Sequence, residues 1–269
     1  MIIIGEKING AIPAVKEAIA ARDAEAIKAR ALAQAAAGAD FLDCAPSTAT
    51  ELEYDAMCWL IDVMQEAVET RLCIDSPDAQ LLARILNEGR VKRPGMVNSV
   101  NEEGTKCETI FPLIAGTQWE VAGLTCDRDG IPADPVKKLE IAKRIIDKAD
   151  RYGVALERLH IDPCVMALAT MPSALEDFVR CIRGIHEYAP QVKVTGAISN
   201  ISFEMPARKF VNSSCMAYAL EAGLDSAIMD PCNQDIMGTI YACEALLSRD
   251  KGGRKYNRAY RKGLFGQRK

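Results

Sequence analysis

Short apolar or β-branched runs alternate with helical patterns eight times along the chain, and this alternation constrains the fold more than any other feature. The candidate strands begin near Met1, Ala39, Arg71, Gly95, Trp119, Arg158, Val192 and Ser226. Strands that alternate with helices predict a parallel sheet with right-handed crossovers. Eight such units, with no glycine-rich turn after the first strand, favour a single-domain (β/α)8 or TIM barrel over an open doubly wound sheet.

Helix boundary signals support this pattern. Asp23 is placed to cap a helix over Asp23–Ala37 that Gly38 ends, and a second helix over Asp134–Tyr152 is closed by Gly153. The chain has 269 residues, which is close to the roughly 250 typical of one barrel.

We therefore expect one domain, a barrel over residues 1–248, followed by a basic C-terminal tail over 249–269. The tail holds nine Lys or Arg residues against one Asp, although the whole chain has a net charge of −4. A solvated terminus and a contact with an acidic partner protein are both compatible with this composition.

The composition of the chain limits where the protein is expected in the cell and what it is expected to bind. No apolar run approaches the ~18 residues of a membrane helix, and the apolar start Met1–Ile4 meets Glu6 and Lys7 too early for a secretory signal. Ten cysteines without a signal peptide, in a chain too large to depend on disulfides, indicate reduced thiols, and no C-x-x-C pair occurs. We expect a cytoplasmic protein that binds neither membrane nor nucleic acid.

Polar residues follow nearly every predicted strand. They are Glu6 and Asn9, Asp43, Asp75, Asn98, Asp162, Ser199 and Asn200, and Asp230. Any one of them is explained equally well as a cap of the following helix, but capping does not require so many carboxylates in one mouth. Because active sites of such barrels lie at the carboxyl ends of the strands, these residues predict a binding site.

Several kinds of chemistry are disfavoured. No Lys ends a strand, as a Schiff-base aldolase would need, and no glycine-rich loop with basic residues offers a phosphate site. His160 lies on the strand face of Asp162 and is interpreted as a hydrogen-bonded core residue, whereas His186 falls near a helix end at the surface. Carboxylates and amides in a dry pocket suit a flat ligand with a donor-rich edge, such as a pterin.

At these strand ends the chain resembles the methyltetrahydrofolate:corrinoid protein methyltransferases, relatives of the folate module of cobalamin-dependent methionine synthase in the pterin-binding superfamily. The motifs that carry the resemblance are Ile4-Gly5-Glu6-Lys7-Ile8-Asn9, Cys73-Ile74-Asp75-Ser76, Val97-Asn98-Ser99, Gly123-Leu124-Thr125 with Gly130-Ile131-Pro132, His160-Ile161-Asp162-Pro163 and Ser199-Asn200-Ile201-Ser202-Phe203.

The resemblance implies that Asp75, Asn98 and Asp162 hold the pterin ring and that Asn200 approaches nitrogen 5, which carries the methyl group. It also implies contacts from Glu6, Asn9, Ser202 and Arg208, and we count Asp43 among the ligand-binding residues. The chain departs from the family at Asp43-Cys44-Ala45, where an Asp-x-Asn is frequent, and at His160, where an aromatic residue is frequent.

The mechanism implied is an in-line displacement of the methyl group to or from cobalt. Asn200 is the expected catalytic donor to nitrogen 5, and a water near Asp162 or Asp75 is the expected proton source. The substrates are tetrahydrofolate or 5-methyltetrahydrofolate and a corrinoid of the cobalamin type. Neither histidine stands in the Asp-x-His-x-x-Gly motif of corrinoid domains, so a separate corrinoid protein is the expected partner, and the family implies a homodimer.

Alternatives stay open at this point. Four cysteines follow predicted strands: Cys44, Cys126, Cys164 and Cys232. One interpretation is a zinc site with thiolate ligands. The favoured interpretation is that they are reduced residues in tight loops and that no metal is tightly bound. A dihydropteroate synthase would share the fold, but the run Met229-Asp230-Pro231-Cys232 lacks that family's Arg-x-His. A non-catalytic folate-binding protein would show the same mouth.

Overall fold

Eight parallel strands form one sheet in the computed structural model, which describes residues 1–266. The strands are β1 Ile2–Gly5, β2 Phe41–Cys44, β3 Arg71–Asp75, β4 Met96–Glu102, β5 Glu120–Asp127, β6 Leu159–Asp162, β7 Lys193–Val194 and β8 Ser226–Met229. All eight start within two residues of the predicted position.

The sheet closes on itself between β7 and β8. Its ladder order is β7-β6-β5-β4-β3-β2-β1-β8. The ends are joined by a bridge between Ala197 and Ile228, and the Ile228 amide donates to the Gly196 carbonyl at 3.0 Å. The predicted (β/α)8 barrel is therefore confirmed.

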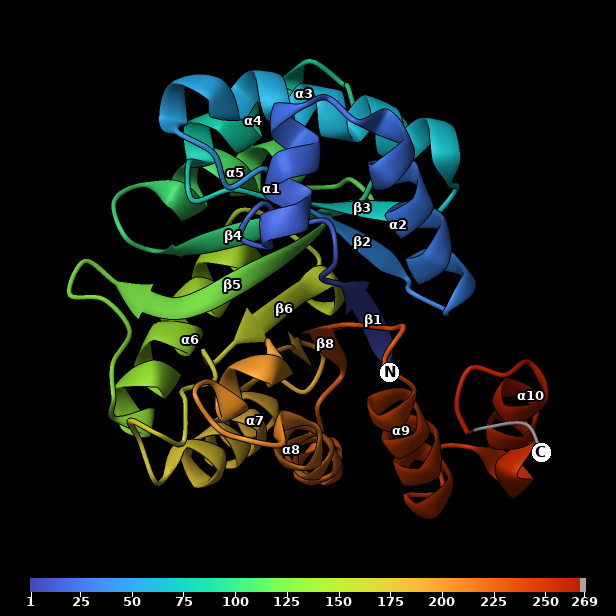
Figure 1. Cartoon of the computed structure of the whole chain (residues 1–269). Helices are drawn as coiled ribbons and strands as arrows, with labels where there is room; N and C mark the ends of the chain where they lie inside the picture. Colours follow the sequence, from blue (N-terminus) through green and yellow to red (C-terminus); the bar gives the residue numbers. More distant parts are fainter. Residues whose placement is uncertain (267–269) are drawn as a thin grey trace.

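Helices surround the sheet on the outside, as Figure 1 shows. They are α1 Pro13–Ala20, α2 Ala24–Ala36, α3 Thr50–Ala67, α4 Ala79–Asn87, α5 Lys106–Ile114, α6 Pro135–Arg151, α7 Ala174–Tyr188, α8 Arg208–Ala222, α9 Gln234–Leu246 and α10 Arg254–Arg261, with 3₁₀ segments η1 Leu156–Arg158, η2 Ile198–Ser202 and η3 Lys251–Gly253. None of the described helices combines the length and the apolar character needed to cross a bilayer.

The boundaries of the two helices predicted from the sequence are confirmed to within one residue. Asp23 and Asp134 are the N-caps of α2 and α6, and each side chain accepts a hydrogen bond from a backbone amide of the first turn. Gly38 and Gly153 follow the helices with φ of +97° and +76°, a left-handed conformation that glycine adopts without strain.

The apolar core has two parts. A large cluster lies between the sheet and the helices, and a small one fills the barrel interior. The interior cluster consists of Ile4, Phe41, Cys73, Met96 and Ala122. This plug separates a polar layer at the amino ends of the strands from another at their carboxyl ends.

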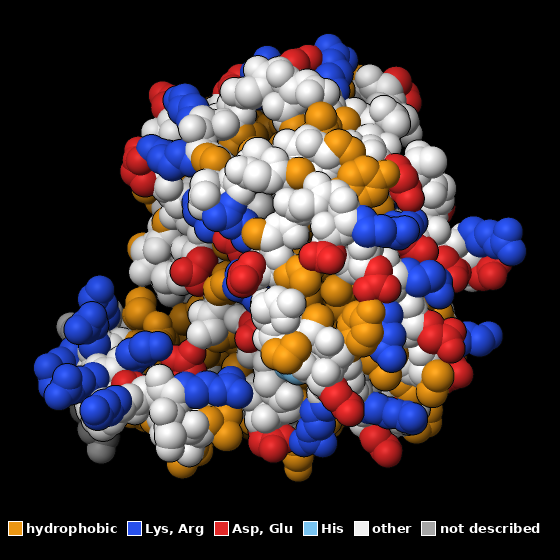
Figure 2. Space-filling model, turned by 180° about the vertical axis from the view of Figure 1, so that it is seen from behind, with side chains coloured by type: hydrophobic (Ala, Val, Ile, Leu, Met, Phe, Trp, Pro, Cys, Tyr) orange, Lys and Arg blue, Asp and Glu red, His pale blue; other side chains and the backbone are white. Residues whose placement is uncertain are grey.

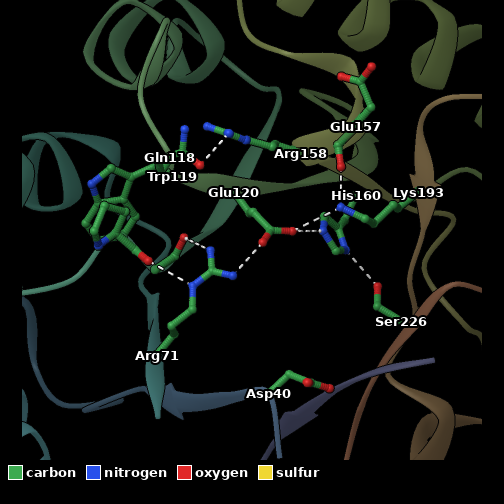
Figure 3. A network of polar contacts seen from close by, with 12 residues as sticks. Asp40, Arg71, Gln118, Trp119, Glu120, Glu157, Arg158, His160, Lys193 and Ser226 are labelled. Carbon is green, nitrogen blue, oxygen red and sulfur yellow. Dashed lines mark hydrogen bonds and ion pairs between the residues drawn. The ribbon is translucent and has the colours of Figure 1, made fainter. Parts of the chain in front are cut away.

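A buried ionic network occupies the amino end of the barrel (Figure 3). Glu120 accepts hydrogen bonds from Arg71 at 2.8 Å, from Nε2 of His160 at 2.7 Å and from Lys193 at 3.2 Å. Nδ1 of His160 lies 2.7 Å from the Ser226 hydroxyl. His160 is fully buried, so the interpretation as a hydrogen-bonded core histidine is confirmed.

The charge states in this network follow from its contacts. Burial alone would raise the pKa of Glu120, but the hydrogen bond from His160 and the contacts with Arg71 and Lys193 outweigh it and lower the pKa to about 2. Burial lowers the pKa of His160, so a neutral imidazole donates to Glu120 and accepts from Ser226. The network closes the end of the barrel opposite to the usual active-site end.

The C-terminal segment folds against α9. Phe265 is 6% exposed and its ring lies among those of Tyr241, Tyr256 and Tyr260, with centroids 5.5, 4.8 and 5.9 Å away. Figure 2 shows Lys and Arg side chains gathered over this segment, at the lower left. Residues 267–269 of the predicted tail lie outside the described residues.

Candidate functional site

A cavity of about 700 Å³ opens at the carboxyl ends of the strands. Its lining includes seven of the nine residues predicted to form the site: Glu6, Asn9, Asp43, Asp75, Asn98, Asp162 and Asn200. This volume is in the range of small-molecule sites. The sequence therefore located the mouth of the barrel from residues spread over almost 200 positions.

Strand register explains why these side chains meet. Asp43 is the ladder partner of Cys73, whose side chain belongs to the barrel interior, and Asp75 is the ladder partner of Asn98. Paired positions on neighbouring parallel strands face the same side of the sheet, and positions two apart on a strand do so as well. Asp43, Asp75 and Asn98 therefore point into the barrel above the apolar plug.

Asp162 is a buried acceptor with one oxygen already used. It is 5% exposed, and its Oδ1 accepts a hydrogen bond from the Cys164 amide at 2.7 Å. Burial raises its pKa to about 6. The second oxygen has no donor among residues 1–266, so it is available to a ligand.

Asp75 and Asn98 place an acceptor beside an amide on neighbouring strands. Burial, and after it the charge of Glu53, raise the pKa of Asp75 to about 7. Glu53 is itself buried and accepts a hydrogen bond from the Ser76 hydroxyl at 2.7 Å. A ligand that donates to Asp75 would stabilise its ionised form.

Glu6, Asn9 and Asp43 form the adjoining wall. The Asn9 amide lies 3.4 Å from Oδ2 of Asp43, and the Ser199 hydroxyl lies 3.5 Å from Glu6. Burial raises the pKa of both carboxyl groups, and in Asp43 the charge of Asp75 adds to the effect. No ion pair within the described part of the chain includes Glu6, Asp43, Asp75 or Asp162.

Each of the two lysines that line the cavity forms an ion pair with an acidic side chain at its rim. Lys7 lies 3.3 Å from Asp230, and Lys106 lies 2.7 Å from Glu103. The interior of the cavity is therefore rich in carboxylate acceptors, and its cationic side chains are engaged at the rim. Such a surface suits a ligand edge that carries several N–H groups.

Ser202 and Arg208 lie outside the cavity lining and support η2, the turn that carries Asn200. The Arg208 guanidinium donates to the Ser202 hydroxyl at 2.9 Å and to the Ser199 carbonyl at 2.7 Å. Ser202 is fully buried, and its hydroxyl contacts the same carbonyl. Both residues therefore act on the cavity through the position of Asn200.

The sequence did not identify part of the lining. The additional residues are Lys7, Ile12, Ser76, Pro77, Ser99, Asn101, Glu103, Lys106, Leu124, Ala197, Ser199 and Ile228. Five of them, Lys7, Ser76, Ser99, Leu124 and Ser199, stand inside the motifs quoted above, and Ser199 was named as a strand-end residue, but none of the five was assigned to the site. Asn101, Glu103 and Lys106 were missed because β4 continues to Glu102 instead of ending at Asn98.

The four cysteines after strands do not form a ligand set. Among residues 1–266, no group of three or more His, Cys, Asp or Glu side chains is placed to hold a metal ion. Cys44 is buried against Met57, Cys126 accepts a contact from Asn101, and Cys232 is exposed. The second histidine, His186, is half-buried at the end of α7 and contacts Asp225, so it is less exposed than expected.

Known proteins resemble the chain in sequence. The family described as pterin binding enzyme matches residues 13–230. A methylcorrinoid:tetrahydrofolate methyltransferase of Eubacterium limosum is 47% identical over 99% of this chain and 98% of that protein. Methionine synthase of Mycobacterium tuberculosis is 31% identical over 85% of this chain, which spans 20% of that longer protein.

Solved structures resemble the chain in fold. Dihydropteroate synthase from Xanthomonas albilineans, in complex with 7,8-dihydropteroate, matches with a TM-score of 0.66. The match covers 92% of this chain and 93% of that one at 18% sequence identity. This likeness concerns the fold alone.

Proposed function

Because the chain belongs to the pterin-binding enzyme family and, within it, to the methylcorrinoid:tetrahydrofolate methyltransferases, we propose that it moves a methyl group between tetrahydrofolate and a separate corrinoid protein. The observation that carries the proposal is the 47% identity over nearly the full length of both chains. The acceptor-rich cavity at the barrel mouth supports it independently.

The cavity fits the pterin part of the folate. A reduced pterin presents a ring N–H, a 2-amino group and a second ring N–H along one edge. We propose that Asp75, Asn98 and Asp162 bind this edge, because they line the same cavity and no cation among residues 1–266 forms an ion pair with either carboxylate. Glu6 and Asn9 would complete the wall.

We propose that Asn200 faces nitrogen 5 of the folate. When the methyl group leaves nitrogen 5, the C–N electron pair stays on nitrogen, which needs a proton or a strong hydrogen bond. The Asn200 amide stands on η2 at the cavity edge and would donate as charge develops there. That bond is stronger in the transition state than in the ground state, which is the condition for acceleration. Asp162 is the proposed anchor of the water that supplies the proton.

The corrinoid is a substrate carried by the partner protein, and its cobalt supplies the nucleophile or the methyl donor. Asn200 is exposed, so the reacting edge of the folate would be accessible from outside the barrel. We also propose a homodimer that pairs through outer helices and leaves both mouths free. Tyr218 of α8 and Leu246 of α9, 60% and 81% exposed, support such a contact.

Stopped-flow absorbance tests the function. We expect the chain to convert cob(I)alamin and 5-methyltetrahydrofolate to methylcobalamin and tetrahydrofolate. Asn200→Ala should slow the single-turnover rate by roughly 10²- to 10³-fold, with a smaller change in folate affinity. Asn87→Ala, at an exposed position at the end of α4, is the matched control. Absence of transfer to free or protein-bound corrinoid would contradict the function, and a wild-type rate in Asn200→Ala would contradict the role of that residue.

A further inference from the structure

Asp43 is the most unusual carboxyl group of the cavity. It is 2% exposed, and its Oδ1 is buried without a hydrogen-bond partner among the described residues. The other oxygen, Oδ2, lies at the long distance of 3.4 Å from the Asn9 amide. An ionised carboxylate with an unpaired buried oxygen carries a large desolvation cost, which a neutral acid avoids.

The groups around Asp43 offer no positive charge. From β1 and the loop after it come Glu6 and Asn9, and from β3 come Asp75 and the Cys73 thiol, the ladder partner of Asp43. Its own strand adds the buried Cys44 thiol, which packs against α3.

Burial favours Asp43 as the carboxyl group of this acidic wall that holds a proton. Burial, and after it the charge of Asp75, raise the pKa of Asp43 well above its usual range. Asp75 is less buried, and burial, followed by the charge of Glu53, raises its pKa to about 7. Two neighbouring carboxyl groups do not both ionise readily, and the more buried one retains the proton.

The bound ligand would need such a donor. A pterin carries acceptors, the ring carbonyl and a ring nitrogen lone pair, beside its N–H groups. The cavity lysines are engaged by rim acids, so the donors left for these atoms are neutral groups such as the amide of Asn98 and the hydroxyl of Ser99.

We propose that Asp43 is a neutral hydrogen-bond donor of the site, which keeps its proton at neutral pH and presents it to an acceptor atom of the bound pterin. Asp75 and Asp162 remain the acceptors. The identity of the ligand rests on the proposed function, whereas the protonation of Asp43 is a property of the free protein. Buried carboxylic acids kept neutral in this way serve as donors in other enzyme sites.

Infrared difference spectroscopy of the ligand-free protein tests the protonation directly. The spectrum of the wild type minus that of Asp43→Asn at neutral pH should show the C=O stretch of a protonated carboxyl group. The control Asp23→Asn, at an exposed N-cap that Asn also satisfies, should show carboxylate bands only. Carboxylate bands alone for Asp43 would overturn the proposal. If Asp43→Asn does not fold, a carbon-13 NMR titration of wild-type protein labelled at aspartate carboxyl groups decides the same point.

The pH dependence of tetrahydrofolate binding tests the donor role. Asp43→Leu removes the donor and should bind roughly three- to tenfold more weakly than Asp43→Asn, whose amide still donates. Folate binding is lost at low pH when Asp75 becomes protonated. If Asp43 is already neutral, Asp43→Asn should leave the pH of this loss unchanged from the wild type. A shift of that loss to lower pH would mean that an ionised Asp43 had been removed, which overturns the proposal. Failure of every variant and of the wild type to bind the folate would refute the proposed function and leave the spectroscopic result valid.

Discussion

Replacement of Asp162 by Asn separates electrostatic recognition from packing. The substitution keeps the shape of the side chain and keeps one oxygen for the Cys164 amide, which donates to Oδ1 at 2.7 Å. It replaces the second oxygen, the one available to a ligand, with an NH₂ group. A donor would then face the N–H groups of the pterin.

The expected loss follows from this geometry. A hydrogen bond to a charged group contributes about 1.5 to 3 kcal/mol, and the substitution also places a donor against a donor. A loss of about 3 kcal/mol corresponds to roughly 10²-fold in affinity for tetrahydrofolate. Fold stability should not fall, because Asp162 makes no ion pair within residues 1–266 and burial of its charge is costly.

Isothermal titration calorimetry with tetrahydrofolate measures the change, and thermal unfolding verifies the fold. The pH profile adds a second criterion. Burial raises the pKa of Asp162 to about 6, so in the wild type the acceptor is lost as the pH falls through this value. The pH dependence of tetrahydrofolate affinity near pH 6 should disappear in Asp162→Asn, while the dependence due to Asp75 near pH 7 remains. Wild-type affinity in Asp162→Asn would refute the assignment of the pterin edge to this wall.

Three further predictions concern other parts of the chain. Glu120→Gln should lower the free energy of unfolding at pH 7 by about 3 kcal/mol, since it breaks a buried ion pair. The pKa of Glu120 is lowered from 4.5 to about 2, so the difference in unfolding free energy between wild type and variant should shrink in urea titrations as the pH falls from 4.5 to about 2. Gly10→Ala should cost about 1 to 3 kcal/mol in thermal stability and weaken folate binding, because its Cβ would lie 2.0 Å from the Pro46 carbonyl oxygen beside the cavity. Phe265→Ala should release the C-terminal helix to limited proteolysis without changing the rate of methyl transfer, since its ring packs among Tyr241, Tyr256 and Tyr260 of α9 and α10, none of which lines the cavity.

The barrel and most of the cavity could be predicted because their signals are local in the sequence. Asp75, Asn98 and Asp162 each follow an apolar run directly, and the rule that carboxyl strand ends share one mouth assembles them without knowledge of contacts. Caps such as Asp23 work in the same way, because a cap and the amides it satisfies are only a few residues apart.

Features that depend on register could not be predicted. β4 and β5 contain register shifts between Asn98, Val100 and Glu102, and these extend the cavity wall to Lys106. The network around Glu120 joins residues from five strands, and each of them alone looks like an ordinary charged or polar position at a strand start.

The most direct test of the account is a crystal structure of the chain with bound 5-methyltetrahydrofolate. The account predicts the pterin ring between Asp75, Asn98 and Asp162, with the methyl group on the side of Asn200 and open to solvent. Density for the folate outside this cavity, or a ring whose N–H edge contacts neither aspartate, would contradict it.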